Sequence, residues 1–526
     1  MGPDKLIIRS EKARLTDILS LLLLRRPFTS YPFVEAGDQT VADLGSTPGG
    51  WFLGLTLLIQ KFLCAIYWPS WCIGVAVEFL LNFVALNSGI LGIIWNIFRC
   101  KLVIPWDREA PEFRSIIGLI DGRTELKPQP PPASSRGDHH ERRRLQVVGI
   151  SGNRGVEECA GLESGERGNA TTTTTTVPLV QQRYSLHEVT VMAAKIAYEN
   201  AAYIENVVNN VWKFHFVGFY SCWNKFMWKD GAYTTQAFVM TDSSSDARVV
   251  VVSFRGTELF NTRDWSTDVD LSWLGLGAMG CVHVGFLKAL GLQEEDDVDP
   301  ARAFPRDLPN NDAAAAAVGN NERPVAYYKL REVLREQLKK HPRARVVVTG
   351  HSLGGALAAI FPALLAFHGE DDVLRRLLAV HTYGQPRVGD AAFAAFCRGR
   401  DPLRVVYRYD LIPRVPWDLP PLARFRHGGA CVYFDGWYRG RELPAGADVP
   451  NRNYVDPGYL LPMYGEAAAD LVRGAVLWVW EGRDYREGAA SLLFRAAGLV
   501  VPGVASHSPR DCVNAVRLGP VARKEA

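Results

Sequence analysis

Ser352 is the residue of this sequence best placed to act as a nucleophile. It lies in Gly350–Gly354 (GHSLG), between a β-branched run that ends at Thr349 and an Ala/Leu-rich stretch. Two glycines around a serine, between a strand and a helix, predict a tight turn that holds the hydroxyl clear of the backbone. The first N–H groups of the following helix can stabilise an oxyanion. The pattern predicts a serine hydrolase, although an ordinary glycine-rich turn would have the same local sequence.

A serine nucleophile needs a histidine base and an acid that orients this base. In one common chain order the acid follows a strand downstream of the serine, and the histidine comes last. Asp410 meets this requirement, because it ends the predicted strand 404–409 and precedes a proline-stiffened turn. Asp401 and Asp418 flank the same unit and remain alternatives. A solvated turn aspartate is the plainer interpretation of Asp410 itself.

Two histidines follow Asp410 in the chain, and one of them should be the base. His427 precedes the predicted strand 430–434, so it should lie at the amino end of that strand, away from the active-site edge of a parallel sheet. His507 lies in a late loop ahead of a predicted helix. The order of residues therefore favours His507 as the base, with His427 as the alternative.

The oxyanion that forms during attack needs two backbone N–H donors. One is Leu353, which directly follows the nucleophile. We expect Thr257 to be the other, because the buried strand 248–254 leads straight to it and its hydroxyl adds a further donor. The next residues, Leu259–Leu274, place large apolar side chains among polar ones. This pattern favours a short amphipathic lid, with a simple surface helix as the alternative.

These residues must be positioned by the second part of the chain, residues 184–526. Predicted strands alternate there with predicted helices, which indicates an α/β domain with a mainly parallel sheet. Residues 293–323 interrupt the pattern, because they are acidic, then alanine-rich, then polar. We interpret them as a surface insertion.

The first part of the chain divides into three predicted segments. Residues 1–50 have a mixed composition, and residues 51–101 are strongly apolar. Residues 102–183 contain a proline cluster, an arginine run and a six-threonine tract, which predict a flexible linker without a core of its own.

The apolar segment predicts an attachment to a membrane or lipid surface. Phe79–Phe98 is a run of twenty residues without a charge, long enough as a helix to span a hydrocarbon core. Glu78 separates it from a shorter apolar run, and we expect this carboxylate at an interface or in a protein contact. A single membrane helix, a hairpin and a monotopic anchor all fit, and a buried hairpin in a soluble protein is the alternative.

Composition and charge argue against several other functions. The net charge of +3 is too small to suggest a nucleic-acid partner. The nine cysteines form no C-x-x-C pair, which suits reduced thiols in a cytosol-facing protein. Neither a metal-ligand cluster nor a nucleotide loop is recognisable, so we expect no cofactor. The N-terminus lacks a recognisable secretory signal.

The domain from Tyr184 onward resembles the class 3, or fungal-type, lipases. The motifs that carry the resemblance follow one another in order: Phe254–Thr257 (FRGT), Val282–Phe286 (VHVGF), Gly350–Gly355, Thr382–Gly389 (TYGQPRVG) and Tyr409–Pro416. The apolar N-terminal region, the linker, Phe425–Gly429 and His507–Leu518 are similar to plant oil-body lipases in particular. The sequence departs from compact fungal members by a long insertion between Asp410 and His507.

The resemblance implies an α/β-hydrolase fold and a triacylglycerol lipase. It implies Ser352 as nucleophile, Asp410 as acid and His507 as base, with Thr257 and Leu353 in the oxyanion hole. The expected partners are an acylglycerol substrate and a membrane or lipid-droplet surface, with the catalytic domain on the cytosolic side. A phospholipase or galactolipase with the same residues is one alternative, and a non-catalytic lipid-surface protein on a hydrolase scaffold is another.

Overall fold

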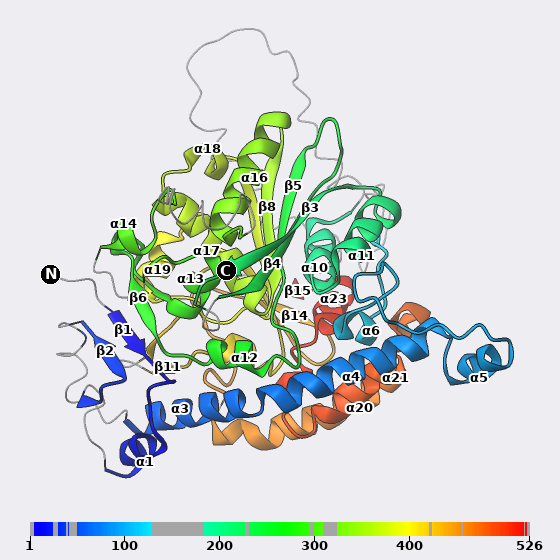
Figure 1. The fold of residues 1–526 in the computed structure, drawn as a ribbon, viewed down its shortest axis with the longest axis horizontal. Helices are drawn as coiled ribbons and strands as arrows, with labels where there is room; N and C mark the ends of the chain where they lie inside the picture. Colours follow the sequence, from blue (N-terminus) through cyan, green and yellow to red (C-terminus); the bar gives the residue numbers. More distant parts are fainter. Residues whose placement is uncertain are drawn as a thin grey trace, which may run out of the picture.

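The protein is built around a nine-stranded sheet, with helices on both of its faces and a further group of long helices along one side (Figure 1). The computed structural model describes residues 5–24, 30–37, 40, 50–128, 184–226, 231–294, 299–308, 323–419, 423–454, 456–519 and 521–522. Most of the predicted linker and of the predicted insertion at 293–323 therefore lies outside the described residues.

The sheet is mixed, with a parallel centre. Its strands β5, β8, β9, β10 and β13 run parallel to one another, whereas β3 and β4 are antiparallel at one edge and β14 is antiparallel to β13. In spatial order the strands are β15 (Val521–Ala522), β14 (Gly440–Leu443), β13 (Cys431–Phe434), β10 (Leu403–Tyr407), β9 (Leu377–Tyr383), β8 (Arg345–His351), β5 (Val249–Phe254), β4 (Ala232–Thr241) and β3 (His215–Asn224). The expected α/β-hydrolase fold with parallel strands is thus confirmed for the centre of the sheet.

The central strands are apolar along their whole length because both faces of the sheet are covered. In β5, Val250 and Val252 pack into one core, whereas Val249 and Val251 pack into the core on the opposite face. The first core is closed by α13 (Val284–Leu290), α16 (Ala326–Lys340) and α17 (Leu353–Phe367), and the second by α10 (Leu186–Ile196), α11 (Ala201–Asn206) and α23 (Pro509–Leu518).

The N-terminal residues are joined to the catalytic domain by a second, four-stranded sheet of order β2-β1-β6-β7. Strand β1 pairs antiparallel with β6, where Leu6 is the partner of Trp273. The strands are β1 (Lys5–Ile8), β2 (Val34–Ala36), β6 (Trp273–Gly275) and β7 (Cys281–His283). This pairing places the start of the chain beside the segment that the sequence predicts as a lid.

The apolar segment forms three helices rather than one continuous span over Phe79–Phe98. These are α3 (Gly50–Ala65), α4 (Tyr67–Leu86) and α5 (Ile90–Phe98). The chain turns between α4 and α5 because Ser88 and Gly89 both have positive φ, 61° and 92°. Among the described residues, only α4 combines the length and the apolar composition needed to cross a membrane, and 11% of its most apolar stretch is buried.

Two residues of α4 explain why the sequence misplaced this helix. Pro69 lies in its first turn, where a missing N–H costs nothing, so it does not end the helix. Glu78 lies in the middle of the helix and forms an ion pair with Arg108. The expected protein contact of this carboxylate is therefore present, and the charge does not divide the two apolar runs.

The first part of the predicted linker, residues 102–128, is packed against the catalytic domain. Asn82 of α4 and Asn87, which follows this helix, donate hydrogen bonds to the carbonyls of Arg114 and Val103, at 2.8 and 2.7 Å. Buried Asp121 then accepts a 2.8 Å hydrogen bond from Arg123, and it pairs with the buried ammonium group of Lys195 on α10. The boundary of the domain differs here from the sequence-based one, because polar anchors of this kind leave no hydrophobic pattern.

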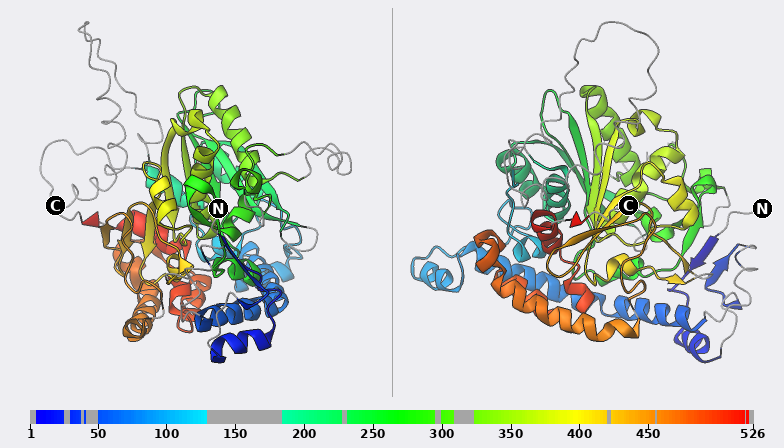
Figure 2. Two further views of the ribbon diagram at one scale, coloured as in Figure 1. Left: turned by 90° about the vertical axis from the view of Figure 1, so that its left-hand side faces the viewer. Right: turned by 180° about the vertical axis from the view of Figure 1, so that it is seen from behind.

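The first half of the insertion between Asp410 and His507 includes β13 and β14 of the main sheet, and the part from Leu460 onward is mainly helical. It contains α20 (Leu460–Glu481), α21 (Ala489–Ala497) and α22 (Pro502–Ala505). In Figures 1 and 2 these helices lie on the same side of the molecule as α3 and α4. The chain then enters α23 through the loop that carries His507.

Candidate active site

Ser352 occupies a strained turn between β8 and α17. Its φ of 59° lies in the left-handed region, which a residue with a side chain adopts only when its surroundings hold it there. A Cβ atom on Gly350 would lie 2.2 Å from the carbonyl oxygen of Gly354, and one on Gly354 would lie 2.3 Å from that of Phe254. Both glycines are therefore required, and the expected nucleophile elbow is present.

Asp410 and His507 are brought together although 97 residues separate them in the chain. The Nδ1 atom of His507 donates a 2.9 Å hydrogen bond to the Asp410 carboxylate, and both residues are buried. Burial raises the pKa of Asp410, and the charge and hydrogen bond of His507 oppose this rise. The Nε2 atom of His507 has no hydrogen-bond partner among the described residues, nor has Oγ of Ser352. The arrangement leaves these two atoms free to act on a substrate.

Two neighbouring residues hold this arrangement in place, and of these the sequence analysis missed Gly384. Gly384, at the end of β9, leaves room for the pair, because a Cβ atom there would lie 2.8 Å from the His507 ring and 2.9 Å from the Asp410 carboxylate. His351 stacks on His507 with ring centroids 4.5 Å apart, and its Nδ1 atom is 2.9 Å from the hydroxyl of Tyr198. The only sequence signal for Gly384 is its place in the TYGQPRVG motif.

Burial lowers the pKa of His351 well below its usual range, and the neighbouring charge of His507 acts in the same direction. A neutral His351 does not repel a proton on His507, which a general base must carry for part of its cycle. His351 is thus a packing and hydrogen-bonding neighbour of the base.

The loop after β5 lies directly against the elbow. A Cβ atom on Gly256 would be 3.0 Å from the Cβ of Ser352, which shows how closely the two backbones approach. Thr257 is buried, and its hydroxyl has no partner among the described residues. Leu353 begins α17, so its N–H lies at a helix N-terminus. The expected oxyanion donors Thr257 and Leu353 therefore flank the nucleophile.

The predicted lid is shorter than its sequence pattern. Helix α12 (Thr262–Asp268) covers only the middle of Leu259–Leu274, and Trp273 and Leu274 belong to β6. The indole of Trp265 meets the His507 ring edge to face, with centroids 6.1 Å apart. Helix α12 also contacts α3, where the hydroxyl of Thr262 donates a 2.8 Å hydrogen bond to the carbonyl of Leu63. The segment covers His507 in this structure.

The residues considered as alternative acids and as the alternative base are bound by other partners than Asp410 and His507 are. His427 is buried, and its Nε2 atom donates a 2.7 Å hydrogen bond to the carbonyl of Pro413. Burial lowers its pKa well below the usual range, with further lowering by nearby arginines. Asp401 accepts a hydrogen bond from the backbone of Gly399, and Asp418 pairs with Arg452.

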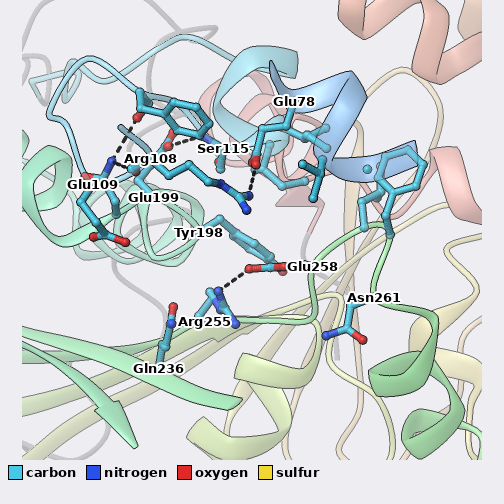
Figure 3. A pocket seen from close by; sticks show the side chains of 18 of the residues that line it. Glu78, Arg108, Glu109, Ser115, Tyr198, Glu199, Gln236, Arg255, Glu258 and Asn261 are labelled. Carbon is cyan, nitrogen blue, oxygen red and sulfur yellow. Dashed lines mark hydrogen bonds and ion pairs between the residues drawn. The ribbon is translucent and has the colours of Figure 1, made fainter. Parts of the chain in front are cut away.

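A cavity of about 300 Å³ is lined in part by the loop after β5, including Arg255 and Glu258 (Figure 3). Two ion pairs face it, Arg108 with Glu78 and Arg255 with Glu258 at 2.6 Å. Tyr198 lines the same cavity and joins it to the histidine stack, whereas the triad residues do not line it. The Arg255–Glu258 pair joins the two residues on either side of Gly256 and Thr257.

Comparisons with known proteins agree with this geometry. The profile of the family described as "Lipase (class 3)" matches residues 251–419. Two plant proteins named "Triacylglycerol lipase OBL1" are each 35% identical to the chain: the one from Arabidopsis thaliana over 98% of this chain and 95% of its own length, and the one from Ricinus communis over 98% and 94%. The chain belongs to the class 3 lipase family. A "Lipase" of Rhizomucor miehei is 30% identical over 38% of this class 3 lipase and 46% of its own chain.

The Asp410→Asn variant of this class 3 lipase should be folded and almost inactive. An amide cannot hold the His507 imidazole in the tautomer that accepts a proton from serine, and the same change in a serine protease lowers kcat about 10⁴-fold. The matched control is Asp401→Asn, which changes the alternative acid in the same domain. Initial rates of ester hydrolysis at saturating substrate measure both variants. A loss of rate in Asp401→Asn that equals the loss in Asp410→Asn would reject the assignment of the acid.

Proposed function

We propose that this class 3 lipase hydrolyses triacylglycerol esters at the surface of a lipid droplet. The observation that carries the proposal is the hydrogen-bonded Asp410–His507 pair beside the Ser352 elbow, in a site covered by the α12 segment. The substrate follows from the near full-length similarity to plant proteins named triacylglycerol lipase.

In the proposed mechanism, Ser352 attacks the ester carbonyl while His507 accepts the serine proton. The N–H groups of Thr257 and Leu353 stabilise the resulting oxyanion, and Asp410 stabilises the protonated imidazole. His507 then gives the proton to the leaving alcohol, and a water molecule, activated by the same histidine, releases the fatty acid. Helix α12 must move first, because Trp265 lies against the histidine.

The apolar helices before the domain support attachment to a lipid surface. The exposed side chains of α4 and α5 include Trp68, Ile73, Leu80 and Phe98. Large apolar areas of this kind are rare on proteins that remain free in water. We infer that these helices hold the protein on the droplet or membrane, with the catalytic domain on the cytosolic side.

A panel of lipids tests the substrate. Purified full-length protein is assayed on emulsified triolein, on phosphatidylcholine and on a monogalactosyl diacylglycerol, and released fatty acid is titrated. We expect triolein to be hydrolysed about tenfold faster or more, which corresponds to about 1.4 kcal/mol in activation free energy. A faster rate on the phospholipid or galactolipid would replace the proposed substrate. Labelling of Ser352 by a fluorophosphonate would exclude the alternative of a non-catalytic lipid-surface protein, because only an activated serine reacts.

A further inference from the structure

Helix α20 has its polarity reversed with respect to a surface helix of a soluble protein. Such helices normally turn apolar side chains to the core and charged ones to water. In α20 the charged residues Asp470 and Arg473 are buried, whereas Leu461, Val472 and Val479 are 85%, 65% and 61% exposed. The third charged side chain between 461 and 480, that of Glu466, is 47% exposed and is paired with Arg408, and the exposed positions of this stretch are otherwise uncharged. The outward face of this helix is therefore apolar over most of its length.

The inward charges are fixed by specific partners, so the helix cannot rotate to hide its apolar face. Arg473 donates a 2.7 Å hydrogen bond to the hydroxyl of Tyr407, and this hydroxyl donates one of 3.3 Å to Asp470. Arg408 forms ion pairs with both Asp470 and Glu466. Exposing these groups to a lipid surface would cost far more than exposing the apolar ones to water.

Helix α21 repeats the pattern. Its Arg495 is buried and donates hydrogen bonds of 2.6 Å to Glu487 and 2.8 Å to Asp511. Leu493 on the same helix is 68% exposed, and Val500 in the turn after it is exposed as well. Two consecutive helices of the insertion thus present apolar side chains outward while their charges point to the catalytic domain.

The position of the apolar face of α20 and α21, and the residues at the C-terminal end of α20, indicate a lipid surface as its partner. Figures 1 and 2 show α20 and α21 on the same side as α3 and α4, and α12 lies between that side and the sheet. At the C-terminal end of α20 the exposed Trp478 and Trp480 are followed by charged residues of both signs, Glu481, Arg483, Asp484 and Arg486, and aromatic residues followed by charged ones are found at a membrane boundary. A face continuous with the lipid-facing helices and beside the covered active site suits lipid better than a second copy.

We propose that α20 and α21 form a second lipid-docking surface, separate in sequence from residues 51–101, which binds the lipid monolayer and holds the catalytic cleft against it. This inference rests on the proposed function, because it takes the lipid phase as the source of substrate. The insertion ends at His507, so the surface is attached through α22 to the loop that carries the candidate base.

The test changes Val472 and Val479 together, as Val472→Gln/Val479→Gln, in full-length protein. The matched control is Val211→Gln/Leu308→Gln, which changes two exposed apolar residues of the catalytic domain away from these helices. Binding to triolein droplets coated with phosphatidylcholine is measured by flotation, with Ser352→Ala added to every protein so that no lipid is consumed. We expect the affinity of the test variant to fall about tenfold or more, and that of the control to stay unchanged.

Unchanged droplet binding in the test variant would overturn the proposal. If the same variant instead converted a dimer into a monomer in light scattering, the face would be an interface between two copies. With Ser352 intact, hydrolysis of the soluble ester p-nitrophenyl butyrate should be equal in the test variant and the parent protein, because the change lies outside the active site. If the parent protein hydrolysed no ester, the proposed function would be rejected. The flotation assay would still test the docking surface, because it does not depend on hydrolysis.

Discussion

Ser352→Ala should lower the rate of triolein hydrolysis by about 10⁵- to 10⁶-fold, to the background that oxyanion donors and substrate binding alone supply. The reason is chemical, because alanine cannot form the acyl-enzyme and no other hydroxyl lies on the elbow. The fold should survive, since the Oγ atom of Ser352 has no hydrogen-bond partner among the described residues. Removing a hydroxyl without a hydrogen-bond partner costs little stability.

The measurement is release of oleic acid at several enzyme concentrations, with circular dichroism and thermal unfolding to confirm the fold. Ser244→Ala, in the exposed turn between β4 and β5, is the matched control and should keep the parent rate. Fluorophosphonate labelling should be lost in Ser352→Ala and retained in Ser244→Ala. Substantial hydrolysis by a folded Ser352→Ala protein would mean that another residue is the nucleophile.

His507→Ala should lower kcat nearly as much as Ser352→Ala, about 10⁵-fold or more, because the members of a catalytic triad act as a unit. Without the imidazole, nothing removes the serine proton and nothing protonates the leaving alcohol. The variant should also react slowly with fluorophosphonate, which separates loss of serine activation from loss of substrate binding.

His427→Gln is the informative comparison, because His427 was the other possible base. Glutamine keeps an N–H donor for the carbonyl of Pro413, so the fold should largely be maintained. We expect its kcat to change by less than about tenfold, since its ring donates to a backbone carbonyl rather than to the nucleophile. If His427→Gln abolished hydrolysis in a folded protein while His507→Ala did not, the base would be His427.

The local parts of the candidate site were predictable because each depends on a short stretch of sequence. The elbow around Ser352 is encoded by two glycines that no side chain can replace, and the oxyanion loop by Gly256 and Thr257 at the end of an apolar strand. Asp410 follows its strand in the same way, although β10 ends at Tyr407 rather than at Tyr409. The alternation of predicted strands with predicted helices likewise indicated the parallel centre of the sheet.

The apolar N-terminal segment shows where prediction from a short stretch of sequence fails. A count of uncharged residues placed one helix at Phe79–Phe98, whereas the chain turns at Ser88–Gly89 and the long helix begins at Tyr67. The ion pair between Glu78 and Arg108 offsets part of the cost of a charge within the helix, so this residue does not interrupt it. The packing of residues 102–128 was missed for the same reason, since its anchors are polar contacts with distant residues.

By itself, therefore, the sequence determined the family and the α/β core, and it selected Ser352 and Asp410 as the candidate nucleophile and acid, because these features reside in contiguous residues. Only the tertiary structure decided that His507 lies 2.9 Å from Asp410, that Trp265 covers it, and that the charges of α20 point inward. A pairing across 97 residues depends on how the insertion packs, and the outward face of a helix depends on which neighbours bind its charges. Neither is encoded in a local pattern.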